Sequence, residues 1–400
     1  MGEDKDEERR RSASSPVSDG DAFVPALFLS APASGQGKTT IAASLARLLT
    51  RRGKAVRIFK KGPDYLDPQI LERATTGGAA AGVVQLDMWM CGEEWCRDQL
   101  YRAATTKGDG GGGGGGGADI ILVEGAMGLY DGNPSSADLA AKFGIPVALI
   151  MDVRAMAQTA AAIAVGLRNY RDDFTMAGVI ANYCGSDYHG RLVRDALPDD
   201  LPLWAALRKT DDVKLPERHL GLDQPCELQG DEDAIERRLE AGADLLEKAG
   251  ILKWIDTLGP VRFRPQRIAP PCRDALAGRT IAVARDDAFS FIYSANTTLL
   301  TDMGASVLFF SPLNDSSVPP SADAVWLPGG YPELHAARLS RNTSMLSSLR
   351  SFHRERGGKP ILAECGGFLY CMETLIDLDG ARWPMAGIMA GCGTMRNRAG

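Results

Sequence analysis

A strand-length apolar run, a glycine-rich loop and an amphipathic run follow one another near the N-terminus. Residues 26–30 (ALFLS) have the length and composition of a buried strand, and residues 39–49 (TTIAASLARLL) have helical spacing of their apolar residues. The segment between them, residues 31–40, is APASGQGKTT. A strand that enters a helix through such a loop starts an α/β unit, so this feature favours a parallel sheet over an all-helical or all-β fold.

The same alternation continues along the chain and restarts after a proline-rich stretch at residues 259–272 (GPVRFRPQRIAPPC). The further strand candidates are residues 55–59, 119–123, 145–151 and 176–181, then 280–284, 306–310, 324–327 and 360–363. Helical patterns such as residues 156–167 lie between several of them. We therefore predict two doubly wound α/β domains, residues 23–262 and 278–400, joined by a linker at 263–277.

Two segments carry no fold signal. Residues 1–22 are charged and serine-rich, which predicts a disordered tail, and the glycine tract 110–117 predicts a flexible surface loop. A net charge of -6 argues against nucleic acid as the main partner, and no apolar run approaches the length of a membrane span. The eight scattered cysteines fit a reducing compartment. We expect a cytoplasmic protein.

The glycine-rich loop predicts a phosphate-binding site. Gly35 and Gly37 allow the backbone N–H groups to turn inward around a phosphate, Lys38 reaches the β- and γ-phosphates, and Thr39 coordinates Mg²⁺. The first glycine of the G-x-x-x-x-G-K-[ST] pattern is replaced by Pro32. The nucleotide-binding candidates are Gly35, Gln36, Gly37, Lys38, Thr39 and Thr40. A partition-type switch ATPase is a distant alternative, but such proteins carry a second lysine early in the loop, where this chain has Ala33.

Two acidic loops follow predicted strands. Residues 59–68 (FKKGPDYLDP) and 123–132 (VEGAMGLYDG) place carboxylates at strand ends, where a ligand binds in a parallel sheet. Near Gly and Pro, aspartates more often cap turns and helices. Two such loops after a phosphate loop favour Mg²⁺ ligands instead.

Cys365 is the candidate nucleophile. In residues 361–370 (ILAECGGFLY) it ends an apolar run and precedes two glycines and an amphipathic pattern, which predicts an exposed thiol between a strand and a helix. A thiol needs a base nearby, because its ordinary pKa lies above neutrality. Of the four histidines, we expect His189 and His353 to be solvated, and His219 belongs to the first domain. His335 follows a predicted strand end, as Cys365 does, so it is a candidate neighbour of the thiol.

The chain resembles the cobyrinic acid a,c-diamide synthases, glutamine-dependent enzymes of cobalamin biosynthesis. The resemblance covers residues 26–391 and rests on seven motifs in order: APASGQGKTT, FKKGPDYLDP, VEGAMGLYDG, LPERHLGL, ARDDAFSFIY, LPGGYPELHA and AECGGFLY. It implies an N-terminal P-loop NTPase domain similar to dethiobiotin synthetase and a C-terminal class I glutamine amidotransferase domain. It also implies ATP-dependent amidation of the a and c carboxylates of cobyrinic acid through an acyl phosphate. Close relatives act on hydrogenobyrinic acid or nickel-sirohydrochlorin.

The resemblance also implies residue roles. Lys38 and Lys60 would assist phosphoryl transfer, and Thr39, Asp64 and Glu124 would hold Mg²⁺. The macrocycle would contact Tyr65, Leu66, Asp67 and Asp131. Cys365 would release ammonia from L-glutamine, with Gly330 and Gly366 supplying the oxyanion N–H groups. A homodimer is left open.

Two departures and one gap remain. Lys61 stands where a small apolar residue is expected, and the glycine tract is foreign to the family's pattern. The family's catalytic histidine follows the cysteine by several dozen residues, whereas this sequence ends about 35 residues after Cys365. We therefore expect a C-terminally truncated form.

Overall fold

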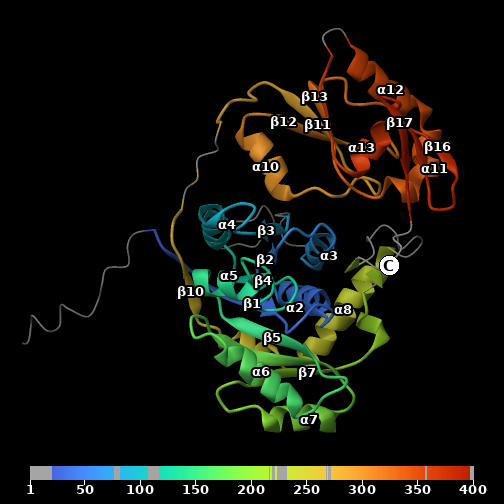
Figure 1. The fold of residues 1–400 in the computed structure, drawn as a ribbon. Helices are drawn as coiled ribbons and strands as arrows, with labels where there is room; N and C mark the ends of the chain where they lie inside the picture. The colour runs from blue at the N-terminus through green and yellow to red at the C-terminus, as the bar shows by residue number, and fades with distance from the viewer. Residues whose placement is uncertain are drawn as a thin grey trace, which may run out of the picture.

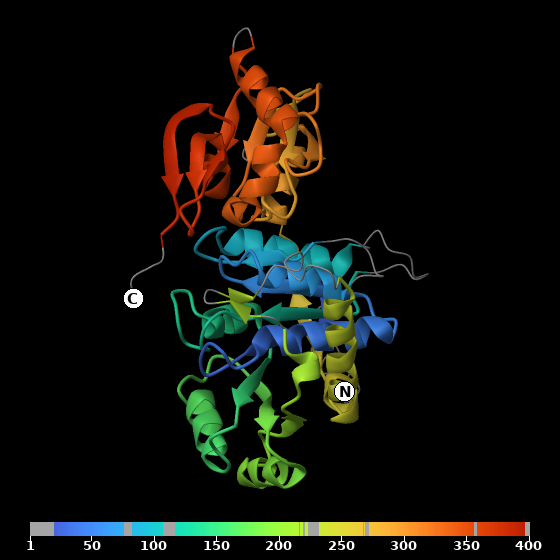
Figure 2. The same ribbon diagram turned by 90° about the vertical axis from the view of Figure 1, so that its right-hand side faces the viewer.

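A computed structural model describes residues 20–75, 82–106, 117–215, 217–218, 221–222, 232–266, 268, 272–355 and 358–396. It contains two α/β domains, as the sequence predicts (Figure 1). In both views the second domain, coloured orange to red, lies on the side of the first domain that carries helices α3 (Asp67–Ala74) and α4 (Glu93–Thr105) (Figures 1 and 2). No helix in these ranges is long and apolar enough to cross a membrane.

The first domain is built on an eight-stranded sheet with the path β3-β2-β4-β1-β5-β6-β7 and with β10 paired to β1. The strands are β1 (Ala22–Ser30), β2 (Val56–Lys61), β3 (Val84–Leu86), β4 (Ile120–Glu124), β5 (Val147–Asp152), β6 (Met176–Cys184), β7 (Leu203–Arg208) and β10 (Pro260–Phe263). All pairings are parallel except that of β10. The central strands are apolar almost throughout because helices cover both faces of the sheet.

Side chains of one strand alternate between two cores. In β1, Leu27 and Leu29 face one core and Phe28 faces the other. The first core packs under α2 (Lys38–Arg51), α3, α8 (Glu232–Lys248) and α9 (Leu252–Ile255). The second core packs under α4, α5 (Ser136–Phe143), α6 (Thr159–Asn169) and α7 (Asp187–Ala196). Two adjacent residues at the end of a strand are therefore directed to opposite faces.

The second domain has a parallel sheet of order β12-β11-β13-β14 and a separate three-stranded sheet of order β16-β15-β17. The strands are β11 (Thr280–Ala284), β12 (Ser306–Phe310), β13 (Ala324–Leu327), β14 (Ile361–Ala363), β15 (Met372–Ile376), β16 (Arg382–Pro384) and β17 (Met389–Thr394). The helices are α10 (Ser294–Asp302), α11 (Ala336–Arg341), α12 (Thr343–Arg354) and α13 (Gly366–Cys371), and a 3-10 turn, η3, spans Pro332–His335.

Several boundaries differ slightly from the predicted ones. β1 begins at Ala22, inside the predicted tail, and Asp21 forms an ion pair with Arg262. β10 ends at Phe263, the first residue of the predicted linker. The short strands β3, β7 and β10 escaped prediction, because each has few apolar residues or is flanked by prolines. Residues 1–19 and 107–116 lie outside the described residues, and the second range contains all of the glycine tract except Gly117.

The LPERHLGL motif contributes a short antiparallel pair, β8 (Glu217–Arg218) with β9 (Gly221–Leu222). His219 lies outside the described residues.

The two domains meet through aromatic side chains. The ring of Tyr65, from the loop after β2, is stacked between Phe291 and Tyr293 of the second domain, with centroid distances of 4.9 and 4.2 Å. Next to this stack, the Ser294 hydroxyl donates a hydrogen bond to the Val83 carbonyl oxygen (3.1 Å). The segment that follows β2, residues 62–67, is thus part of the domain interface; it is called the acceptor loop from here on.

Candidate active site

The phosphate loop joins β1 to α2 and is shaped by two glycines with positive φ. Gly35 has φ 76° and Gly37 has φ 87°, a conformation that glycine adopts without strain. A Cβ at Gly37 would also lie 2.4 Å from Asn182 Nδ2, which donates a hydrogen bond to the Gln36 carbonyl (3.0 Å). The end of β6 therefore fixes the turn that precedes α2. Backbone N–H groups at such a helix start bind phosphate.

The Lys38 side chain connects the phosphate loop to the loop that follows β4. Its Nζ donates to the carbonyl of Met127 (2.7 Å) and to that of Ala33 (3.3 Å). Burial lowers its pKa to about 8, although Glu124 opposes the shift. An ammonium that is held only by carbonyl oxygens can exchange them for phosphate oxygens.

Glu124 lies at the end of β4 and is completely buried. Its Oε1 accepts a hydrogen bond from the Thr39 hydroxyl (2.6 Å) and lies 3.1 Å from Lys60 Nζ. Its Oε2 has no hydrogen-bond partner among the described residues. Burial raises the pKa of Glu124 to about 7, against the effect of Lys60. An unpartnered carboxylate oxygen beside a threonine hydroxyl of the phosphate loop suits Mg²⁺.

Lys60 is the cation of this cluster. It pairs with Asp67 as well as Glu124, and its register partner across β2 and β4 is Glu124 itself. Burial opposes its charge, but Glu124, Asp67 and Asp64 together hold its pKa above the usual value. Lys60 therefore remains charged at neutral pH.

The two aspartates of the acceptor loop differ in their surroundings. Asp64 Oδ1 accepts hydrogen bonds from the backbone N–H groups of Leu66 (2.8 Å) and Asp67 (3.0 Å), so it caps the turn that starts α3. Asp67 is the one paired with Lys60. Among the described residues, no three His, Cys, Asp or Glu side chains are grouped as metal ligands. The geometry thus brings Thr39 and Glu124 together and directs Asp64 toward the backbone.

The residues expected at the macrocycle lie around this cluster. Leu66 is partly exposed, and Asp131 is exposed, with its Oδ2 accepting from the Gly128 N–H (2.9 Å). Both faces of the Tyr65 ring are covered by the second domain, so only its edge remains for a ligand.

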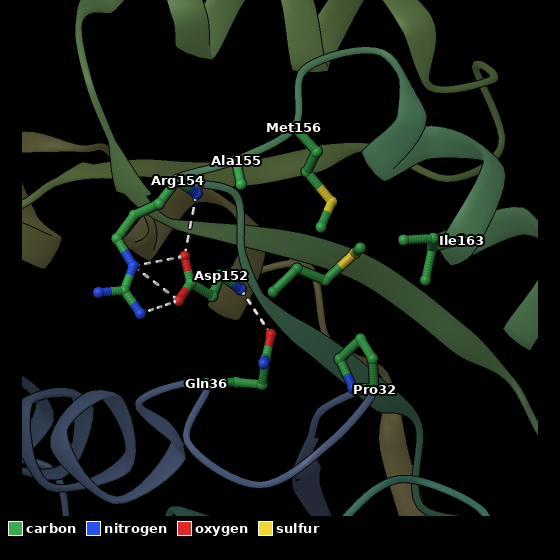
Figure 3. A pocket seen from close by; sticks show the side chains of 8 residues that line it. Pro32, Gln36, Asp152, Arg154, Ala155, Met156 and Ile163 are labelled. Atoms are coloured by element: carbon green, nitrogen blue, oxygen red, sulfur yellow. Dashed lines mark hydrogen bonds and ion pairs between the residues drawn. The ribbon is translucent and has the colours of Figure 1, made fainter.

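A cavity of about 410 Å³ lies beside the phosphate loop, on the side of α6 (Figure 3). The Asp152 N–H donates to Gln36 Oε1 (2.7 Å), and the Asp152 carboxylate accepts from Arg154. The wall is completed by Pro32, Met151, Ala155, Met156 and Ile163. The sequence analysis did not identify this cavity. The cavity could have been found from Asp152, because this acidic residue stands at the end of a predicted strand, the feature that selected Glu124.

The second site is at the end of β14. Cys365 is exposed and has φ 46° and ψ −109°, an uncommon conformation for a residue with a side chain. The next two residues must be small: a Cβ at Gly367 would lie 2.1 Å from the Leu327 carbonyl oxygen, and one at Gly366 2.8 Å from Pro332 Cδ. This strained strand-to-helix turn presents the Cys365 thiol at its tip, the arrangement of a nucleophile elbow.

The proposed oxyanion glycines are close together. A Cβ at Gly366 would lie 3.1 Å from the Gly330 N, and one at Gly329 would lie 3.5 Å from Cys365 Cβ. The backbone N–H of Phe291, a member of the interface stack, donates to the Gly329 carbonyl (3.1 Å). The Gly329–Gly330 turn is thereby connected to the domain interface.

The described histidines occupy different environments. His335 is buried on η3, which packs against the start of α13, and His353 is exposed as expected. The expectation for His189 is wrong, because its Nδ1 accepts from the Gly185 N–H (3.1 Å) and its Nε2 lies 2.7 Å from the Met156 carbonyl oxygen. The polar residues around the start of α7 suggested an exposed ring. Instead, the ring accepts a hydrogen bond from the backbone just before the helix.

The first domain has a phosphate loop beside a buried acid cluster, and the second domain has a cysteine at a strained turn. Together these features define a glutamine amidotransferase-type ligase. Residues 27–222 match the model of the CobQ/CobB/MinD/ParA nucleotide binding domain, and residues 280–399 match the CobB/CobQ-like glutamine amidotransferase domain. The chain belongs to the family of a,c-diamide synthases that contains hydrogenobyrinate and cobyrinate a,c-diamide synthases.

Three relatives illustrate the similarity. The hydrogenobyrinate a,c-diamide synthases of Stutzerimonas stutzeri and Pseudomonas aeruginosa are 48% and 47% identical to this chain, in each case over 94% of it and 81% of the relative. The cobyrinate a,c-diamide synthase of Herminiimonas arsenicoxydans is 46% identical over 91% of this chain and 77% of the relative.

Proposed function

We propose that this protein uses ATP to amidate the a and c carboxylates of a cobyrinic-acid-type tetrapyrrole, with ammonia released from glutamine at Cys365. The observation that carries the proposal is the buried cluster of Thr39, Lys60 and Glu124 at the phosphate loop. A carboxylate does not react with ammonia directly, because oxide is too poor a leaving group. Transfer of the γ-phosphoryl group to it gives an acyl phosphate, from which ammonia displaces phosphate.

The cations of the first site are placed for phosphoryl transfer. The loop N–H groups of residues 35–40 would bind the phosphates of ATP, with Lys38 and Lys60 approaching the transferred group from two strands. Such transfer depends on positioning and charge stabilisation rather than on covalent chemistry. Lys60 remains charged because its carboxylate partners outweigh its burial.

Thr39 and Glu124 are the residues that would hold Mg²⁺, and the unpartnered Glu124 Oε2 supports this assignment. Asp64 would join them through water or after the turn that it caps has rearranged. Mg²⁺ bound there would neutralise charge on the β- and γ-phosphates. We further propose that Tyr65, Leu66, Asp67 and Asp131 border the macrocycle, since their loops flank this cluster.

In the second site, the Cys365 thiolate would attack the carboxamide carbon of glutamine. The C–N bond then breaks, ammonia leaves, and water hydrolyses the remaining glutamyl thioester. The backbone N–H groups of Gly330 and Gly366 would stabilise the oxyanion, which their close approach supports. Ammonia would then pass to the acyl phosphate in the first domain.

Purified protein incubated with ATP, Mg²⁺ and ammonium tests the proposal with three macrocycles in parallel: cobyrinic acid, hydrogenobyrinic acid and nickel-sirohydrochlorin. Mass spectrometry would show two successive exchanges of hydroxyl for amino groups on the true substrate. The names of the first two relatives favour hydrogenobyrinic acid as a second candidate beside cobyrinic acid. Absence of ATP-dependent amidation with every macrocycle would contradict the proposed function.

A further inference from the structure

Lys61, the last residue of β2, has a largely buried side chain whose Nζ atom still contacts solvent. Its exposed fraction is 5%, yet its Nζ forms no hydrogen bond and no ion pair with any described residue. Burying a charged group without a partner is costly, so proteins keep such groups rarely. The position is also unusual in sequence, because the pattern of the family predicts a small apolar residue there.

The side chain of Lys61 is directed away from the phosphate-transfer cluster. Ile58 and Phe59 of β2 face opposite cores, and Lys60 continues the face of Ile58, where Glu124 and Asp67 bind it. Lys61 continues the face of Phe59, on the side of α4 and α5. The two lysines therefore serve different parts of the site.

The carboxylates that face Lys61 are already hydrogen-bonded elsewhere. Asp87 accepts from the N–H groups that follow it, at residues 89 and 90, and Asp131 accepts from Gly128. Asp138 accepts from Ser135 at the start of α5 and from Arg171. Burial lowers the pKa of Lys61, these three acids oppose that shift, and Lys60 adds to it. None of them binds the ammonium directly, so its hydrogen bonds are left for another acceptor.

Two exposed apolar side chains lie at the same end of the sheet as Lys61, whose register partner in β3 is Leu86. Trp89, just after the adjacent strand β3, is 80% exposed, and Met127, in the loop after β4, is 45% exposed. A Cβ on Gly132 would lie 3.0 Å from Met127 Cε and 3.4 Å from Lys61 Nζ, so both atoms converge on one point of that loop. Because the Nζ atom contacts solvent, a ligand can reach the ammonium. A cation beside exposed apolar side chains suits an apolar ring that carries carboxylates.

We propose that the Lys61 ammonium binds a carboxylate arm of the macrocyclic substrate, other than the arm that faces the phosphate loop. The inference rests on the proposed function and adds a substrate-binding residue to it. The arm would receive up to three N–H donors from Lys61, while the ring would lie against Trp89 and Met127. Lys61 would thereby fix the orientation of the ring and so the choice of the carboxylate that reaches Lys60.

Equilibrium titration of the full chain with hydrogenobyrinic acid and cobyrinic acid, followed by protein fluorescence, tests the inference. We expect Lys61→Met to weaken binding of the tightest-binding acid at least tenfold, because a charge-assisted hydrogen bond is lost. The heptamethyl ester of cobyrinic acid, which has no carboxylates, should bind wild type and variant equally. Affinity for ATP should not change. The matched control is Lys142→Met, which removes an exposed lysine from nearby α5 and should leave all affinities unchanged.

Thermal unfolding separates binding from a structural role. Removal of an unpartnered, largely buried charge should leave the Tm equal or higher, and Lys61→Gln is a second variant with a polar side chain of similar reach. Equal binding of the acid by wild type and both variants would overturn the inference while leaving the proposed function intact. Equal losses for acid and ester, or a variant that does not fold in either form, would show that Lys61 is structural. Failure of wild type to bind any acid would overturn both.

Discussion

The ring of Tyr65 lies almost parallel to the ring of Tyr293, at an interplanar angle of 14° and a centroid distance of 4.2 Å. Phe291 covers the other face of Tyr65 at 8° and 4.9 Å. Tyr65 belongs to the loop that carries Asp64 and Asp67, whereas Phe291 is bonded to the oxyanion segment through Gly329. The loop after β2 is therefore linked to the Gly329–Gly330 turn, which lies beside Cys365, through the stacked rings of Tyr65 and Phe291.

Removal of one ring should loosen the domain contact. Tyr293→Ala loses a stacked aromatic pair, which contributes about 0.5–1.5 kcal/mol beyond its buried area. We expect faster amide hydrogen exchange in residues 62–68 and 290–294, with unchanged exchange in α2. Tyr293→Phe keeps the ring but loses the hydroxyl that is hydrogen-bonded to Tyr65, so it should show a smaller increase. Unchanged exchange in Tyr293→Ala would show that the stack does not hold the loop.

Lys38→Met should abolish ATP-dependent amidation without unfolding the protein. Loss of one donor to a developing charge typically lowers kcat by about 10²–10³. The fold should tolerate the change, since the partners of Lys38 among the described residues are two backbone carbonyl oxygens, one in its own loop and one in the loop after β4. Steady-state amidation with ammonium, together with a Tm measurement, checks this. Near-normal turnover would contradict the assignment of the phosphate loop.

Glu124 should make the protein less stable as the pH rises. Burial raises the pKa of Glu124 from 4.5 to about 7, so the folded state retains a proton that the unfolded state releases. Its contribution to stability is complete below pH 4.5 and decreases as the pH rises through about 7. In EDTA, urea unfolding at pH 5 and pH 8 should show a smaller loss of stability for Glu124→Gln than for wild type. A loss of equal size in both would contradict this pKa shift.

Glu124→Gln should also separate catalysis from substrate binding. The variant keeps the size of the side chain but lacks a negative oxygen for Mg²⁺, so Mg²⁺-dependent turnover should decrease at least a hundredfold. Binding of the macrocycle should change little. Asp131→Asn should show the opposite pattern, because Asp131 lies on the exposed loop and outside the ion cluster. Identical behaviour of the two variants would remove the distinction between metal and substrate roles.

Cys365→Ala should abolish amidation with glutamine and leave amidation with ammonium unchanged. The thiol lies in the second domain, whereas the phosphate loop and the acid cluster lie in the first. Cys392→Ala, which removes another exposed thiol of the second domain, is the matched control and should retain both activities. Parallel assays with the two nitrogen donors distinguish the variants. Glutamine-dependent turnover by Cys365→Ala would assign the nucleophile elsewhere.

The sequence alone determined those features whose chemistry is local in the chain. Gly35, Gly37 and Lys38 form one loop because consecutive residues dictate its backbone, and apolar runs that alternate with helical patterns require a parallel sheet. Cys365 followed by two glycines predicts a strained turn for the same reason. The fold class and the family were therefore accessible without coordinates.

Only the tertiary structure decided how these parts face one another. The register of β2 against β4 sets Lys60 opposite Glu124, and strand alternation turns the adjacent Lys61 to the other face. Domain docking, which no local pattern encodes, covers Tyr65 with Phe291 and Tyr293. The partner of a charged side chain depends on which segments fold against it. A pair of residues more than fifty positions apart, such as Lys60 and Glu124, therefore cannot be predicted from a local motif.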